Sequence, residues 1–218
     1  MARPRDDDLR QKLIDAATAA FAENGYHGSS LDDIGARAGV TKGGVYFHFD
    51  GKEELFFAVL DHWQQRRRRQ LTVPARGPTG AATALQAFLS AYLGFHFRAP
   101  QATHLLRVLA TELRGKFTAR LREDDRNEQR WLRATVRELL TQGQSDGTLF
   151  VDDPAQSAFL LVAAVTGVLE QWHTGAGDVA AFCHEEALAR ALVARYATGQ
   201  RQAPPADAEF DFRERPSP

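Results

Sequence analysis

Apolar residues recur every three or four positions along much of the chain, and beyond residue 80 no convincing alternation of apolar and polar residues appears. Leu9, Leu13 and Phe21 belong to one such stripe, which predicts a helix that follows a mobile charged arm at 1–8 and ends near residue 25. Positions three and four apart lie on one face of an α-helix. The pattern therefore predicts an all-α fold.

Two very short helices are expected after this first one. Leu31, Ile34 and Ala38 share one face of the earlier helix, and Ser30, with an acidic residue three positions later, makes a capping-box-like start. Gly39 then supplies the backbone freedom that a sharp turn between two helices needs.

The second short helix is expected to be buried through Val40 and Val45 and to present its remaining residues outward. An aromatic cluster at 46–49 follows, and Asp50 has the position of an N-cap for a helix that runs to about residue 70. Two short helices joined by a tight turn are the arrangement by which a small domain presents one helix to the major groove of DNA.

The stretch from about residue 9 to residue 60 resembles the DNA-binding domain of the TetR family of bacterial transcription regulators. The family's pattern has Ile and a small residue, Ala-Gly-Val, Ser or Thr, Lys-Gly, Tyr, His-Phe, and Lys-Glu before Leu. These stand here as Ile34-Gly35, Ala38-Gly39-Val40, Thr41, Lys42-Gly43, Tyr46, His48-Phe49, and Lys52-Glu53 with Leu55. Gly35 and Gly44 depart from the pattern, and the second of them removes a side chain that could have touched a base.

The resemblance and the turn-forming residues divide the chain into four parts. The boundary is clearest at 72–80, which contains two prolines and two glycines. We expect a three-helix helix-turn-helix domain at 1–50, a connecting helix at 51–71, a larger helical domain for ligand binding and dimerisation at 80–198, and a disordered tail at 199–218.

Composition narrows the possible chemistry. The 218 residues carry a net charge of -1, so any charge that binds DNA has to be local to one face. The single cysteine, Cys183, excludes an internal disulfide and fits the cytoplasm, and the longest apolar run, 158–165, is too short to cross a membrane. Because no nucleophile–base pair or paired metal-ligand spacing is present, we expect no enzyme activity, metal or cofactor.

Nine residues are candidates for contact with double-stranded DNA. Lys42 suits a phosphate or a guanine edge, and hydroxyl groups at helix starts suit phosphate. Other roles remain open, because Ser30 and Thr41 can cap helices, Tyr46 can pack, and His48 can be structural. The candidates are Ser29, Ser30, Thr41, Lys42, Gly43, Gly44, Tyr46, His48 and Lys52.

Two arginine-containing segments allow a structural and a binding interpretation. Arg3 and Arg5 could reach a minor groove or belong to a solvated tail. The four arginines at 66–69 would point nearly all round a helix, so a solvated helix end is favoured over a binding patch.

A ligand pocket in the larger domain is implied by the resemblance. Aromatic residues with a few polar groups are typical of small-molecule sites, although each one can equally be ordinary core, and we expect a partly apolar effector. The candidates for lining the pocket are Phe95, His96, His104, Phe117, Trp131, Phe159, Glu170 and Trp172.

The helix that starts after Asp153, an N-cap followed by proline at the first helical position, is apolar nearly all round. Such a helix is buried on more than one side, and in the TetR family the last two helices form a four-helix bundle with a second subunit. The candidate dimer interface consists of Phe159, Val162, Val165, Leu169, Leu188, Leu192 and Tyr196.

Together these features predict a homodimeric, ligand-responsive transcription regulator, with the family favouring a repressor. Its two recognition helices would enter a pseudo-palindromic operator whose half-sites lie ~34–36 Å, or a multiple of this distance, apart. The alternative is a helical small-molecule-binding or interaction protein that has lost DNA binding.

Overall fold

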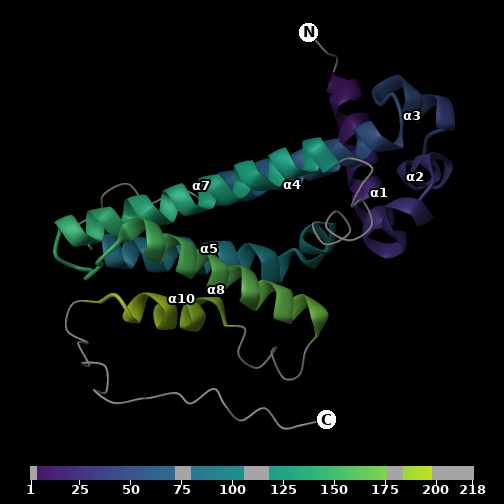
Figure 1. The fold of residues 1–218 in the computed structure, drawn as a ribbon. Coiled ribbons are helices and arrows are strands. Elements are labelled where there is room, and N and C mark those ends of the chain that lie inside the picture. The colour runs from purple at the N-terminus through teal and green to yellow at the C-terminus, as the bar shows by residue number, and fades with distance from the viewer. Residues whose placement is uncertain (1–3, 72–79, 106–117, 176–183, 198–218) are drawn as a thin grey trace.

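The computed structural model describes residues 4–71, 80–105, 118–175 and 184–197 (Figure 1). These residues form helices and contain no β-strand, which confirms the all-α prediction. The helices are α1 (Pro4–Gly28), α2 (Leu31–Ala38), α3 (Lys42–His48), α4 (Lys52–Gln70), α5 (Gly80–Arg98), α7 (Thr118–Ser145), α8 (Pro154–Thr174) and α10 (Glu185–Ala194).

Two hydrophobic cores hold these helices together. The first core lies among α1–α4 and includes Leu13, Phe21, Ile34 and Val45, each fully or almost fully buried. The second core lies among α5, α7, α8 and α10, with α7 and α8 packed against each other. Figure 1 places α1–α3 at one end of the molecule and the second group of helices at the other, with α4 extending between them.

The capping signals predicted at Ser30, Gly39 and Asp153 form as expected. The Ser30 hydroxyl accepts a hydrogen bond from the Asp33 amide at 3.1 Å, and Gly39 has φ 74°, a left-handed conformation that glycine adopts without steric cost. At the start of α8, one Asp153 carboxylate oxygen accepts from the amides of Ala155 and Gln156. These contacts fix where the short helices and α8 begin.

The expected end of the first helix near residue 25 is confirmed, because Gly25 has the non-helical angles φ 71° and ψ 179°; the residues 26–28 beyond this break are again helical and are counted in α1. Two local expectations were wrong. The predicted mobile arm at 1–8 is helical from Pro4, because proline suits the first helical turn. Asp50 is not the N-cap of α4: that position belongs to Gly51, and the Asp50 amide donates to the Glu54 carboxylate instead.

Several expectations lie outside the described residues, namely those for Arg3, Phe117 and the tail at 199–218. Within the described ranges, no helix combines the length and the apolarity needed to cross a membrane.

Candidate functional site

The turn between α2 and α3 is tight because position 35 is a glycine. A Cβ atom there would lie 3.1 Å from both the Val40 carbonyl oxygen and the Val45 Cγ2 atom. The Gly35 carbonyl also accepts a hydrogen bond from the Val40 amide at 2.9 Å. The glycine at this position therefore avoids a tight contact between the two helices.

Helix α3 presents one face to solvent. Val45 is fully buried and Phe49 almost so, whereas Tyr46 is 49% exposed and Phe47 is 74% exposed. Phe47 was not among the predicted contacts. Helical periodicity could have found it, because it lies two positions from each of the buried residues and therefore on the opposite side of the helix.

Polar residues at the start of α3 surround this face. Thr41, Lys42 and Gly43 are exposed, and the Thr41 hydroxyl caps α3 by accepting from the Gly44 amide at 3.4 Å. The Lys42 ammonium lies 3.0 Å from an Asp32 carboxylate oxygen on α2. Thr41, like Ser30, thus has the capping role that was left open for it, and DNA contact by either stays a prediction.

Two predicted DNA contacts have structural partners instead. Ser29 is 4% exposed, and its hydroxyl lies 3.0 Å from the Ala20 carbonyl and 2.7 Å from the Gly25 carbonyl. The Lys52 ammonium donates to the carbonyls of Tyr26 and Ser29, at 2.8 Å each. Lys52 therefore fastens the α1–α2 connection to the start of α4, whereas Ser29 ties this connection back to α1, and its burial keeps its hydroxyl away from a phosphate.

Gly44 and His48 also differ from a simple outward-facing arrangement. A Cβ atom on Gly44 would point at Val40, 3.2 Å from its Cβ, so the glycine accommodates the turn and does not replace a base contact. His48 is half-buried, with its ring beside those of Phe47 and Phe49. A contact between His48 and DNA stays a prediction.

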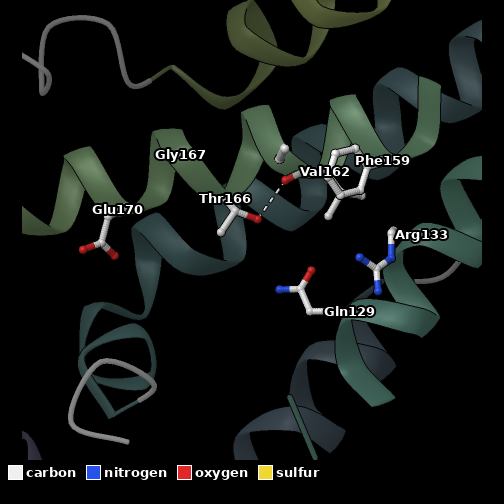
Figure 2. A pocket seen from close by; sticks show the side chains of 8 residues that line it. Gln129, Arg133, Phe159, Val162, Thr166, Gly167 and Glu170 are labelled. Atoms are coloured by element: carbon white, nitrogen blue, oxygen red, sulfur yellow. Dashed lines mark hydrogen bonds between the residues drawn. The ribbon is translucent and has the colours of Figure 1, made fainter. Parts of the chain in front are cut away.

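An open groove of about 490 Å³ lies between α7 and α8. Figure 2 shows Gln129 and Arg133 of α7 facing Phe159, Val162 and Thr166 of α8 across it, with Glu170 at the far end. Of the predicted pocket residues, Phe159 and Glu170 line this groove. The Phe159 side chain is 55% exposed, so the groove presents an aromatic surface to solvent.

The other predicted pocket residues that the structure describes lie elsewhere. Phe95 and His96 line a much smaller cavity beside α4. Trp131 packs on Phe88 in the second core, and Trp172 packs on Phe97, with ring centroids 6.0 and 5.1 Å apart. His104 is half-buried and lines neither cavity. The seven described candidates therefore do not form one pocket.

The predicted dimer interface needs a similar correction. Val162, Val165 and Leu169 are buried in the core of their own subunit, so they cannot form the surface of contact with a second one. Leu188, Leu192 and Tyr196 are half-buried against the same core. Of the predicted interface residues on α8, only Phe159 is exposed, at 55%; the other large exposed apolar residue of this helix is Leu160, at 54%, which was not predicted.

The arginine run at 66–69 is not simply a solvated helix end. Arg67 is 3% exposed and its Nη2 atom lies 2.6 Å from a Glu128 carboxylate oxygen on α7, while the Arg68 Nη2 atom lies 3.4 Å from the other oxygen. The two guanidinium groups also stack over Tyr92 and Trp131, respectively. These contacts join α4 to α5 and α7.

Known proteins resemble the N-terminal domain in sequence. Residues 13–59 match the family model described as bacterial regulatory proteins of the tetR family. The HTH-type transcriptional regulator SrpR of Pseudomonas putida is 48% identical over 54 residues, which make up 25% of this chain and 25% of SrpR. The matches to SrpR and three further curated regulators span between 25% and 44% of the length of those proteins.

Solved structures resemble the chain over most of its length. A TetR transcriptional regulator from Chloroflexus aurantiacus has a TM-score of 0.71 at 26% identity, over 91% of this chain and 98% of that one. The SmeT–triclosan complex, from Stenotrophomonas maltophilia, has a TM-score of 0.68 at 26% identity, over 88% and 93%. The two comparisons agree: residues 13–59 match the tetR family of bacterial regulatory proteins, and the whole chain has the fold of TetR transcriptional regulators.

Proposed function

We propose that the protein is a sequence-specific DNA-binding transcription regulator that acts in the cytoplasm as a homodimer. The observation that carries this proposal is the outward face of α3, where Lys42, Tyr46 and Phe47 are exposed. A tight turn at Gly35 and Gly39 holds this face away from the core. A short helix held in this way fits the major groove of DNA.

The residues of α3 would make different kinds of contact with DNA. Lys42 carries the positive charge and would exchange Asp32 for a phosphate or a guanine edge. Tyr46 and Phe47 offer large exposed rings, which suit contact with the sugar–phosphate backbone and with the methyl group of thymine. Ser30, Thr41, Gly43, Gly44 and His48 remain predicted contacts, whereas Ser29 and Lys52 would act by holding the domain together.

Dimerisation would use the outer stripe of α8. Leu160 and Ala164 are exposed at a spacing of four residues, next to the stripe that lines the groove, and Leu160 is 54% exposed. A second copy packed on this stripe would bury these side chains. The resulting two-fold axis requires a pseudo-palindromic operator with half-sites ~34–36 Å, or a multiple of this, apart.

A small, partly apolar effector would act through the larger helical domain. The α7–α8 groove has the size of a small-molecule site and combines Phe159 with the polar side chains of Gln129, Arg133 and Glu170. An effector that binds more tightly to the conformation that does not bind DNA lowers the affinity for the operator, because the coupling between the two binding events is reciprocal. As the family resemblance implies, we propose that the regulator is a repressor released in this way.

Binding to a labelled DNA duplex of random sequence, measured by fluorescence anisotropy across a salt series, tests the proposal. We expect saturable binding whose logarithmic affinity falls linearly with the logarithm of the salt concentration. The double variant Tyr46→Ala/Phe47→Ala should bind more weakly at every salt concentration. Absence of binding by the folded protein at low salt would contradict a DNA-binding function.

A further inference from the structure

The C-terminal end of α4 is attached to the larger domain through a carboxylate that is itself nearly buried. Glu128 of α7 is 12% exposed and pairs with Arg67, which is 3% exposed, and with Arg68, which is 46% exposed. Among the described side chains, Glu128 is the one carboxylate within ion-pair distance of these two guanidinium groups.

This ion pair leaves hydrogen-bonding capacity unused. The Nη2 atom of Arg67 is paired with the Glu128 carboxylate, whereas the Nε atom of Arg67 is buried without a hydrogen-bond partner. The Nε2 atom of His96, a residue that is 1% exposed, is in the same situation. Each unsatisfied buried group is costly, so a group that pairs with these atoms would bind with a gain in free energy.

Both residues line one small cavity of about 10 Å³, which we call the α4 notch; Trp63 and Gln64 of α4 also line it. This volume admits a single water-sized group. A larger group therefore cannot enter the notch unless a side chain in contact with Arg67 moves. Glu128, which pairs with Arg67 but is not one of the residues that line the notch, is the side chain that would move.

His96 is suited to donate a hydrogen bond inside the notch while it remains neutral. Burial, together with the charge of Arg67, lowers the pKa of His96 to about 3. Its Nδ1 atom lies 2.8 Å from the Thr103 hydroxyl, which can rotate to donate to Nδ1. In that arrangement the proton of the neutral ring lies on Nε2, and Arg67 lines the same cavity.

We propose that the α4 notch binds one carboxylate group of an acidic ligand, which takes the place of Glu128 on Arg67. The donors of Arg67 match a carboxylate in charge and geometry, and His96 and the amide of Gln64 add further donors. Glu128 can leave because it reaches the surface beside Arg68, whose guanidinium stays available as its partner.

The exchange separates α4 from α7 at Arg67. Helix α4 also belongs to the first core, together with α1–α3. A ligand in the notch would therefore change how α4, and the DNA-binding helices packed on it, are held against the larger domain. This consequence rests on the proposed function, whereas binding of the carboxylate does not, and the two are measured separately.

Formate, the smallest carboxylate, is the probe. In full-length protein labelled with ¹⁵N-tryptophan, the indole signal of Trp63, assigned with Trp63→Phe, should move saturably as sodium formate replaces sodium chloride at constant ionic strength. The signal of Trp172, which packs on Phe97 away from the notch, should stay in place. Formamide, a neutral molecule of the same size, should leave the Trp63 signal unmoved, and an equal response to formamide would overturn the proposal.

Variants distinguish a specific site from a general anion effect. Glu128→Gln removes the competing carboxylate and should tighten formate binding by about tenfold, the size of one charge-assisted hydrogen bond. Arg67→Gln/Glu128→Gln removes both charges together, so that no charge is left buried alone, and should abolish binding. The exposed Arg69→Gln is the matched control and should bind formate like the unmodified protein.

The proposal fails if Glu128→Gln binds formate no more tightly than the unmodified protein, or if the double variant still binds it. Release of DNA by formate, measured separately by anisotropy, tests the consequence for regulation.

Discussion

Lys42 of α3 and Asp32 of α2 form an exposed ion pair, with the ammonium 3.0 Å from the carboxylate oxygen. The hydrogen bond with Asp32 and its negative charge raise the pKa of Lys42, so the ammonium remains charged over the physiological range. A DNA phosphate that approaches α3 therefore meets a lysine that already has a partner. Asp32 both competes for the lysine and repels the phosphate.

Replacing Asp32 should strengthen DNA binding, whereas replacing Lys42 should weaken it. We expect Asp32→Asn to raise the affinity for duplex DNA severalfold at low salt, with the gain lost at high salt because the charge is exposed. Lys42→Ala should lower the affinity and reduce the salt slope by about one if the lysine meets a phosphate. Anisotropy titrations over a salt series measure both effects.

Asp61→Asn, an equal change of charge on the exposed surface of α4, is the control for the Asp32 variant. If Asp61→Asn strengthens binding as much as Asp32→Asn does, the effect is one of overall charge. An unchanged affinity and salt slope in Lys42→Ala would remove this lysine from the interface.

Gly35→Ala should destabilise the protein although alanine favours helix. The added methyl group would lie 3.1 Å from the rigid Val40 carbonyl oxygen. We expect a net loss of about 1 kcal/mol in the free energy of unfolding, because crowding outweighs the gain in helix propensity. Gly43→Ala, whose methyl group would have no neighbour closer than 3.8 Å, should instead be neutral or stabilising. Urea unfolding compares the two, and a stabilised Gly35→Ala would refute the close-packed turn.

Two substitutions on α8 should separate folding from dimerisation. Val165 is fully buried, so Val165→Asp should lower the free energy of unfolding by about 4 kcal/mol or more and disrupt the larger domain. Leu160 is 54% exposed, so Leu160→Asp should remain folded and yield monomers. Circular dichroism and analytical ultracentrifugation report the two properties. A folded, dimeric Leu160→Asp variant would place the interface elsewhere.

His96 should make the protein less stable in acid. The pKa of this residue is about 3 in the folded chain, against an ordinary value of 6.5, so between these pH values the unfolded chain binds a proton that the folded chain does not. Stability therefore falls as the pH drops from about 6.5 toward 3, by at most ~1.4 kcal/mol per pH unit, and His96 has no such effect at higher pH.

The variant His96→Gln should lack this part of the pH dependence, measured by urea unfolding at several pH values between 4 and 7. Replacing the half-buried His104 by glutamine should leave this pH dependence of stability unchanged. Equal slopes in His96→Gln and the unmodified protein would mean that His96 is not held neutral by burial.

The short helices could be predicted well because their signals are local. Ser30, Gly39 and Asp153 each act on backbone groups within a few residues, so their capping roles follow from the sequence. Lys52 could not be assigned in the same way, because the carbonyls of Tyr26 and Ser29 that it contacts are distant in sequence. Its match to the family pattern therefore carries structural information as well as functional information.

The larger domain was harder to predict because its residues are ordered by tertiary packing. Val165 and Leu160 are both apolar residues of one helix, and only the positions of the neighbouring helices decide that the first is core and the second is surface. Arg67 likewise lies in a run of four arginines, and its burial depends on Glu128, which is distant in sequence. Periodicity predicts helices, but it does not predict which helix covers which face.

The central claim, sequence-specific DNA binding by a dimer, is tested most directly by selecting bound duplexes from a random DNA pool with purified protein near physiological salt. We predict enrichment of an inverted repeat whose half-site centres lie ~34–36 Å, or a multiple of this distance, apart, and its loss in Tyr46→Ala/Phe47→Ala. Absence of any enriched sequence, from protein that is folded and dimeric and with cell extract present to supply an effector, would contradict the account and favour a helical small-molecule-binding protein without DNA binding.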